Sequence, residues 1–532
     1  MSTEPALDRQ AARVRAFRLV QEIQGAGHAA AAELGALASA AAGAGWDEVV
    51  RVGLFGRAVD LWFRRDPGVG EAVSRLVESA TAAEDNVMLA VALAMRSDVA
   101  FAGPEDAPAA EADLARAVVL LEQASDSPLE CITGHTACGI ALAARWLFEL
   151  ADEQYAAALD VGSAQPPGAA DFLLAPVMFN RAELHLAWAS LLRQLGDATG
   201  VGERWRTWRA AGMAAASFGM PEVWQAELRA HGLLLAAIAG EDVAIEAAER
   251  LEQLERLEGR GQDASRASSH LLLAWALSDA QAGRAEAAER AEVAARRLDP
   301  DASPHVYDLA LHLAAELEAA DGRRAGIRYG HRQLEQHWSS RLASLGAMRA
   351  RIQAERLAAE REILSRHART DDLTGVGNRR ALDQYMADVR RLDVGTVALI
   401  LIDVNAFKEV NDRHGHLAGD AVLMRIGLVL GRSVRPSDLA VRLGGDEFAV
   451  VLAHADLEAA VARAIDIAGQ IDRASFDDIS PGLTVALSAG VAAGAPARLT
   501  ELRALADAAL YRAKAGEGEK VVRSRVARAE RA

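Results

Sequence analysis

The chain has 532 residues, a formal net charge of −17, 51% hydrophobic residues and 25% charged residues. This length predicts roughly two to four domains, and the composition excludes a mostly disordered protein. An acidic surface repels nucleic acid and anionic lipid, so we expect neither as a partner. Phosphate-bearing ligands would therefore need a local site, such as one that holds a metal ion.

The sequence also restricts disulfides, zinc sites and membrane insertion. The only cysteines, Cys131 and Cys138, are too few for a disulfide framework or a four-cysteine zinc site. The N-terminus lacks the charged-then-apolar order of a signal peptide. Apolar stretches such as 87–95 are far shorter than the roughly 20 residues that span a bilayer. We expect a cytoplasmic protein without a membrane span.

The front of the chain reads as an all-α region with internal repeats. Ala, Leu, Glu and Arg dominate up to about residue 365, a mixture with high helix propensity. Gly196, Gly240, Gly283 and Gly322 each follow a helix-like stretch, at spacings of 44, 43 and 39 residues. Two helices in each such unit are typical of a helical solenoid, similar to tetratricopeptide-type repeats. A plain Ala-rich helical bundle is the alternative. We assign residues 1–327 to this region and expect it to bind a protein partner or sense a signal.

A single continuous helix is predicted over residues 328–369, as a linker. Its apolar positions recur at steps of three and four residues, which is typical of a short coiled coil that would join two copies of the chain. The alternative is a last repeat helix followed by a solvated linker. The seam positions are Trp338, Leu342, Leu345, Met348 or Arg349, Ile352, Arg356, Ala359 and Ile363.

The pattern changes after about residue 394. Apolar runs at 397–402 and 448–452 predict short buried strands between amphipathic helices. Gly444 and Gly445 lie just before the second run and predict a tight hairpin, because glycine accepts positive φ angles. We therefore expect an all-α N-terminal region and an α/β C-terminal region.

Carboxylates occupy the ends of these predicted strands. Asp403 follows the first run, and a carboxylate that closes a buried strand needs a partner. Asp446 and Glu447 begin the second strand, where alternation would point them to opposite sides. If the strands pair, Asp403 and Asp446 meet at one sheet edge, where two carboxylates and a backbone carbonyl suit Mg²⁺. The chain has no G-x-x-x-x-G-K-[ST] motif, which excludes a P-loop enzyme.

Five motifs follow one another between residues 371 and 514. They are D-x-L-T-x-x-x-N-R from Asp371, D-x-x-x-F-K-x-x-N-D from Asp403, Gly419-Asp420, G-G-D-E-F from Gly444, and Y-x-A-K ending at Lys514. At this spacing the segment resembles the GGDEF domain of diguanylate cyclases, over less than a third of the chain. The resemblance implies a palm-like α/β domain with a five-stranded sheet at residues 370–523, followed by a disordered basic tail at 524–532.

The resemblance also implies an activity and its site. Two GTP molecules would be condensed into cyclic di-GMP and pyrophosphate by a homodimer that needs two Mg²⁺ ions per active site, with Mn²⁺ as a substitute. Asp403, Asp446 and Glu447, with the carbonyl of Val404, would hold the metal, and Glu447 could also help deprotonate the 3′-hydroxyl. Among the GTP contacts, Asn411 and Asp420 would read guanine, Phe407, Lys408 and Lys514 would face the phosphates, and Gly445 would let the backbone approach the nucleotide.

Two further features bear on regulation and strength of catalysis. Arg435 and Asp438 match the R-x-x-D product-inhibition site of the family, and Arg463 is a candidate helper. After Lys514 the family usually has a basic residue, whereas this chain has Glu517 and Glu519, which predicts weaker triphosphate binding unless Lys520 compensates. We expect structural roles for His414 and His416. The alternative function is a weak or inactive GGDEF protein that acts as a receptor for cyclic di-GMP or GTP, or as a scaffold.

Overall fold

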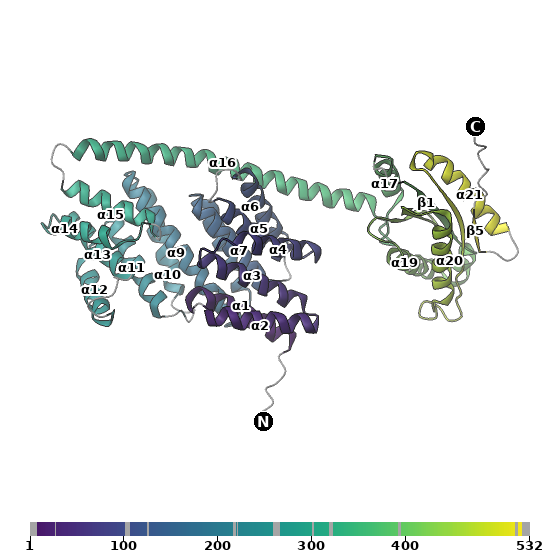
Figure 1. The fold of residues 1–532 in the computed structure, drawn as a ribbon, viewed down its shortest axis with the longest axis horizontal. Coiled ribbons are helices and arrows are strands. Elements are labelled where there is room, and N and C mark those ends of the chain that lie inside the picture. Colours follow the sequence, from purple (N-terminus) through teal and green to yellow (C-terminus); the bar gives the residue numbers. More distant parts are fainter. Residues whose placement is uncertain are drawn as a thin grey trace, which may run out of the picture. The chain divides into compact units, whose positions relative to one another are not determined.

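The protein forms two compact units, divided between Arg356 and Leu357, in a computed structural model (Figure 1). We call them the helical unit and the α/β unit. Among the described residues, no helix combines the length and apolar character needed to cross a bilayer. The structure describes residues 8–26, 28–101, 107–124, 127–215, 220, 222–258, 266–300, 303–318, 323–391, 395–515 and 520–523.

The helical unit is built from consecutive helices that pack on their neighbours in sequence. Most helices contact the next helix and many contact the one after it, as α1 does with α2 and α3, and α13 with α14 and α15. This contact pattern is that of stacked helical hairpins and is consistent with the predicted helical repeats. The helices are α1 (Arg9–Ala26), α2 (His28–Ala44), α3 (Asp47–Phe63), α4 (Val69–Ala82), α5 (Asn86–Phe101), α6 (Ala107–Glu122), α7 (Pro128–Ala144), α8 (Phe148–Ser163), α9 (Asp171–Gln194), α10 (Ala198–Ala215), α11 (Glu222–Ile238), α12 (Ala244–Glu258), α13 (Arg266–Gln281), α14 (Ala287–Arg297) and α15 (Pro304–Leu317).

Three of the four predicted glycine helix ends are confirmed. Gly196, Gly240 and Gly283 have φ angles of 78°, 96° and 70° and lie two residues beyond the ends of α9, α11 and α13. Glycine adopts this left-handed conformation without steric cost, which lets the chain turn into the next helix. The fourth, Gly322, lies outside the described residues.

Several imidazoles are buried inside the helical unit. His231 on α11 and His270 on α13 are 0% and 1% exposed, their ring centroids are 5.0 Å apart, and none of their ring nitrogens has a hydrogen-bond partner within the described structure. Burial lowers the pKa of His231 and of His305 to about 4. These imidazoles are therefore neutral at pH 7.

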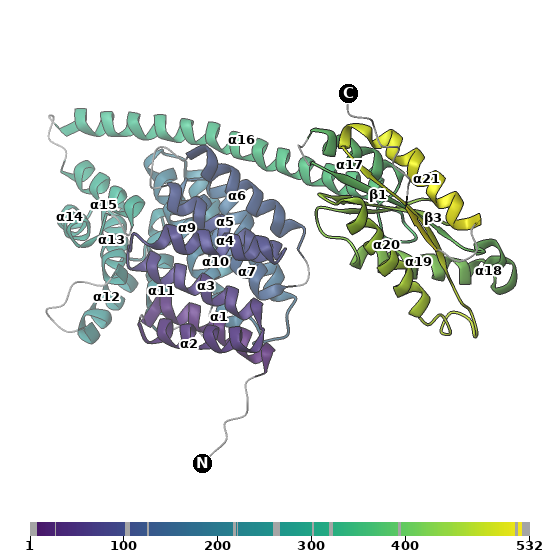
Figure 2. The same cartoon turned by 45° about the vertical axis from the view of Figure 1, so that its right-hand side comes forward.

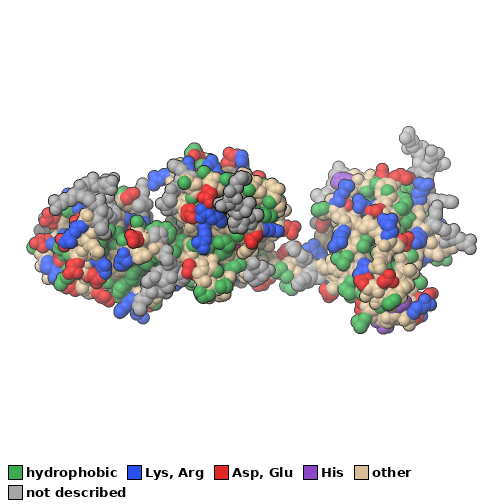
Figure 3. All heavy atoms as spheres, turned by 90° about the horizontal axis from the view of Figure 1, so that it is seen from below, with side chains coloured by type: hydrophobic (Ala, Val, Ile, Leu, Met, Phe, Trp, Pro, Cys, Tyr) green, Lys and Arg blue, Asp and Glu red, His purple; other side chains and the backbone are tan. Residues whose placement is uncertain are grey.

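The surface of the protein is mixed in charge, with acidic and basic side chains interspersed over the face in Figure 3.

The helix α16 (Arg323–Arg369) begins five residues before the predicted linker helix and ends where that prediction ends. Leu345, Met348 and Ile352 are buried, with Arg341 on the same face. Ion pairs of α16 with α8 and α6 flank this face. They join Arg341 to Glu149 at 2.7 Å, Arg349 to Glu153 at 3.4 Å, Arg351 to Glu111 at 3.5 Å and Arg356 to Glu122 at 2.5 Å.

The predicted coiled-coil seam is thus divided in the structure. Its members Leu345, Met348 and Ile352 are buried within the helical unit, whereas Leu342 and Ile363 are 52% and 47% exposed. Arg356, an unusual seam residue, is accounted for by its pair with Glu122. A coiled coil with a second copy remains a prediction.

The α/β unit has a five-stranded sheet of order β2-β3-β1-β4-β5, in which only β4 and β5 are parallel. Helices α19 and α20 cover one face, and α17 and α21 cover the other (Figure 2). The elements are α17 (Arg379–Arg391), β1 (Val397–Val404), α18 (Phe407–His414), α19 (His416–Arg432), β2 (Leu439–Gly444), β3 (Glu447–Ala453), α20 (Leu457–Arg473), β4 (Leu487–Gly494), the 3₁₀ turn Pro496–Arg498, α21 (Leu499–Ala515) and β5 (Val521–Arg523).

The two predicted strands are confirmed as β1 and β3, and they pair with each other. Every residue of β1 is buried, as expected for a central strand with helices on both faces. The sequence predicted that Asp446 begins the second strand. This prediction is wrong, because β3 begins at Glu447 and Asp446 lies in the turn before it. The predicted basic tail at 524–532 lies outside the described residues.

Candidate active site

The site is centred on Asp403, the penultimate residue of β1. Asp403 lies directly across from Glu447 on β3 and from Ser488 on β4, so these three side chains leave the same face of the sheet. Asp403 alternates with Leu399 and Leu401, which belong to the core beneath α17 and α21. The carboxylate therefore faces α21, the helix that carries Lys514.

An ion pair compensates the buried carboxylate. Nζ of Lys514 lies 2.6 Å from Oδ2 of Asp403. Burial raises the pKa of the Asp403 carboxyl, the Lys514 ammonium opposes the increase, and the nearby Asp446 carboxylate adds to it. Two acidic groups and one cation thus share the end of β1. The sequence indicated that Asp403 needs a partner but not that Lys514 supplies it.

Arg442 holds the glycine turn in place. Its Nε and Nη2 donate to the carbonyl of Gly445 at 3.0 and 2.8 Å, and its Nη1 donates to Asp371 at 3.2 Å. Burial alone would raise the pKa of Asp371, but hydrogen bonds from Thr374 and the Arg442 guanidinium hold it below its usual value. The D-x-L-T motif therefore braces the G-G-D-E turn, a role for Arg442 that the sequence analysis missed.

The turn after β1 leads into two helices that carry four of the predicted GTP contacts. Ala406 has a left-handed φ of 53° and is the N-cap of α18, which begins at Phe407. Phe407 packs partly buried against the core, Lys408 is exposed beside it, and Asn411 lies on the same helix. Asp420 lies on α19, which packs against α18. The fold thus places these side chains on neighbouring helices.

Gly419 is a second residue whose role the sequence analysis missed. A β-carbon at Gly419 would lie 2.0 Å from Oδ1 of Asn411 and 3.2 Å from the Phe407 ring. Any side chain there would displace Asn411, so glycine is needed for the predicted guanine-binding residue to keep its position. The Gly419-Asp420 pair in the motif was the sequence feature that could have indicated this role.

Comparison with known proteins identifies the α/β unit. The family model "Diguanylate cyclase, GGDEF domain" matches residues 368–520. An uncharacterized protein in the hutH 5′ region of Streptomyces griseus is 40% identical over 169 residues, which are 31% of this chain and 67% of that protein. The chain belongs to the GGDEF family.

Other relatives of this GGDEF protein carry functional names. The probable diguanylate cyclase DgcT of Escherichia coli is 34% identical over 160 residues, and the diguanylate cyclase DgcP of Pseudomonas aeruginosa is 38% identical over 151 residues. These matches span 29% and 28% of this chain but only 35% and 22% of the two relatives. A solved structure of the coiled coil and GGDEF domain of DgcB from Caulobacter crescentus is 29% identical, covering 35% of this chain and 99% of that one with a TM-score of 0.30.

The R-x-x-D segment of the GGDEF domain forms a turn before β2. One carboxylate oxygen of Asp438 accepts from the backbone N–H of Arg435 at 3.1 Å, and the other accepts from the N–H of Ala453 at 3.1 Å. Tyr385 donates to the carbonyl of Ser437 at 2.6 Å. The Arg435 residue is exposed. Arg463, the candidate helper, donates instead to the carbonyl of Ser433 at 2.9 Å.

The remaining sequence predictions for the GGDEF domain fall around this centre. Lys520, the residue that could compensate for the missing basic residue, pairs with the Asp472 carboxylate at 2.6 Å. Glu517 and Glu519 lie outside the described residues. His414 bonds Ser480 through Nδ1 at 2.8 Å, consistent with a structural role, and His416 is exposed.

The donors at the end of β1 fit a hard cation, although no three-ligand cage is preformed. Within the described part of the chain, no group of three or more carboxylate, imidazole or thiol side chains is arranged to hold a metal. The Lys514 ammonium against Asp403 shows that a cation does fit beside this carboxylate. Oxygen donors of this kind suit Mg²⁺ or Mn²⁺, which complete their coordination with water and substrate phosphate.

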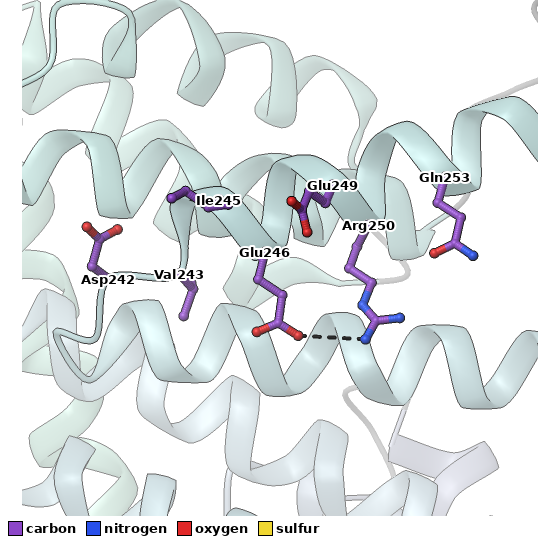
Figure 4. Close-up of a pocket in the computed structure, with 7 residues that line it drawn as sticks. All are labelled: Asp242, Val243, Ile245, Glu246, Glu249, Arg250 and Gln253. Carbon is purple, nitrogen blue, oxygen red and sulfur yellow. Dashed lines mark ion pairs between the residues drawn. The ribbon is translucent and has the colours of Figure 1, made fainter.

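The helical unit has a shallow groove of its own along α12, of about 580 Å³ (Figure 4). It contains none of the predicted site residues. Acidic side chains and an exposed isoleucine line it, together with one arginine that pairs with Glu246 at 3.8 Å. The lining residues are Asp242, Val243, Ile245, Glu246, Glu249, Arg250 and Gln253.

Proposed function

We propose that this chain is a diguanylate cyclase that condenses two GTP into cyclic di-GMP and two pyrophosphate. The observation that carries the proposal is the register of β1 and β3, which sets Asp403 opposite Glu447 beside the Asp446 turn. The named relatives DgcT and DgcP support the same activity. Each GTP would use its 3′-hydroxyl to attack the α-phosphate of the other, so that two phosphodiester bonds form and two pyrophosphates leave.

The metal site would comprise the carboxylates of Asp403, Asp446 and Glu447 and the carbonyl of Val404. When bound, Mg²⁺ supplies positive charge at the phosphates, where negative charge develops as pyrophosphate leaves. Glu447 begins β3 and is exposed, so it can accept the proton of the 3′-hydroxyl.

Substrate selection would rest on α18 and α19. Asp420 can accept hydrogen bonds from N1–H and N2–H₂ of guanine, donors that adenine lacks, and Asn411 can pair with the remaining base edge. Gly419 keeps Asn411 in place. Lys408 and Lys514 would neutralise the triphosphate, and Gly445 would leave room for the nucleotide at the turn.

Condensation needs two GGDEF domains, so we propose a homodimer formed through α16. One face of α16 is occupied within the helical unit, but an opposite stripe repeats at steps of three and four residues and is exposed throughout. Leu357 and Leu364 in this stripe are 44% and 67% exposed. A strict heptad stripe is the pattern that a second helix covers. It consists of Ala343, Ala347, Ala350, Ala354, Leu357, Arg361 and Leu364.

We also propose product feedback at Arg435 and control by the helical unit. The Arg435 guanidinium is free to grip a guanine edge or phosphate, while Asp438 is committed to holding the turn. The helical unit packs directly on α16 and would pass a signal or partner's presence to the dimerisation helix.

Turnover of GTP with Mg²⁺ by the full-length protein tests the proposal, with pyrophosphate and cyclic di-GMP measured together. Asp446→Ala should abolish product while cyclic di-GMP still binds, because Asp446 lies in the turn and its loss leaves the sheet intact. Tight nucleotide binding without product at any protein concentration would instead favour the alternative, a receptor for cyclic di-GMP or GTP.

A further inference from the structure

The Lys514–Asp403 pair joins a fixed anion to a movable cation. The Asp403 side chain is 8% exposed and the Lys514 side chain is 43% exposed. Asp403 is held by a strand paired on both sides, with β3 and with β4. Lys514 lies in the last turn of α21 on a long flexible stem. Any rearrangement of this pair must therefore move the lysine.

The pair lies among further carboxylates. Glu447 is directly across the sheet from Asp403, and Asp446 is close enough to raise the Asp403 pKa. A buried carboxylate is costly without a compensating charge, and Lys514 provides that charge. The oxygen that it contacts belongs to the residue expected to ligate the metal.

We propose that Lys514 and a divalent cation compete for Asp403, and that a triphosphate relieves the competition by giving Lys514 a new partner. The inference rests on the proposed function for its metal and its nucleotide. An ammonium and a divalent cation repel each other too strongly to share one carboxylate oxygen. Metal alone must break the ion pair without replacement, whereas metal with GTP leaves Lys514 bound to phosphate. By linkage, each ligand then raises the affinity for the other.

Binding of Mn²⁺ to the full-length protein, followed by electron paramagnetic resonance without nucleotide, tests this independently of turnover. Lys514→Met should bind Mn²⁺ about tenfold more tightly than wild type, because the competing cation is gone. In wild type, Mn²⁺ should strengthen binding of a non-hydrolysable GTP analogue by a larger factor than in Lys514→Met. Formation of the free Mn²⁺–analogue complex is common to both proteins and cancels in this comparison.

Two control variants separate direct competition from a general charge effect. Lys408→Met also removes one positive charge, but Lys408 is not part of the ion pair, so its Mn²⁺ affinity should stay within about twofold of wild type. Asp403→Ala should lose Mn²⁺ binding. The competition would be overturned, and the metal site retained, by either of two results. One is an equal increase in Mn²⁺ affinity in both lysine variants. The other is an unchanged Mn²⁺ affinity in Lys514→Met while Asp403→Ala still loses Mn²⁺ binding. Absence of Mn²⁺ binding from wild type even with the analogue would overturn the proposed metal site together with it.

Discussion

The buried imidazoles make the helical unit sensitive to mild acid. His231 and His305 have pKa values lowered from 6.5 to about 4 by burial. The unfolded chain therefore binds a proton at each imidazole below pH 6.5, while the folded chain remains neutral there until about pH 4. Lowering the pH from 6.5 to 4 consequently favours the unfolded state. At pH 5 each imidazole should lower the free energy of unfolding by about 2 kcal/mol.

Two such groups amount to about 4 kcal/mol, a large part of the roughly 5–15 kcal/mol that stabilises a typical domain. Urea unfolding of the full-length protein at pH 7.5 and 5.0, followed by tryptophan fluorescence, measures the loss. The nine tryptophans all precede residue 339 in the sequence, so the signal reports the helical unit alone.

His231→Leu should reduce the pH-dependent loss by about 2 kcal/mol, because an apolar side chain cannot take up a proton in either state. The matched control is His331→Leu, which makes the same replacement at a partly exposed position on α16; an equal change in both variants would contradict the argument from burial. If wild type and His231→Leu lose the same free energy of unfolding between pH 7.5 and 5.0, the argument from burial is wrong.

Two further substitutions test the α/β unit. Gly490→Ala should destabilise it by about 1–3 kcal/mol and reduce GTP turnover, because the new β-carbon would lie 2.1 Å from the carbonyl oxygen of Ala506 in α21, the helix that carries Lys514. Thermal unfolding followed by circular dichroism measures this loss of stability. The control is Gly494→Ala in the same strand, where the new β-carbon would meet only the flexible Leu502 side chain at 3.1 Å, so the loss should be smaller. Equal losses in the two variants would contradict the role of the backbone contact. Arg435→Ala should raise the cyclic di-GMP concentration needed for half-inhibition of turnover at least about tenfold, since its guanidinium is the free donor of the turn; unchanged inhibition would place the product site elsewhere.

Local patterns predicted much of this fold. The strands β1 and β3 were visible as apolar runs because central strands are buried on both faces. The left-handed glycines after α9, α11 and α13 were visible because few other residues adopt that conformation cheaply. The start of α16 was missed by five residues, since helix ends depend on packing and capping more than on propensity.

Contacts between distant residues could not be predicted in the same way. The pairing of Lys514 with Asp403, and the bridge from Arg442 to Gly445 and Asp371, depend on how helices and strands meet across the sheet. Spacing along the chain carries no information about them. For the same reason the sequence did not show that Leu345, Met348 and Ile352 of the predicted seam are buried within the helical unit, because periodicity shows that a face is apolar and not which partner covers it.

The continuity of α16 has a mechanical consequence. The helix has 47 residues and contains no proline, and within the helical unit its buried and exposed faces belong to the same helix, so they turn together. If the helical unit came to accept the face one residue along, the helix would rotate by about 100° about its axis. Within the helical unit, the exposed positions Ala343, Ala347, Ala350 and Ala354 would turn through the same angle. A ligand that reshapes the surface on which α16 packs would therefore turn the exposed stripe proposed for dimerisation, without contacting the nucleotide.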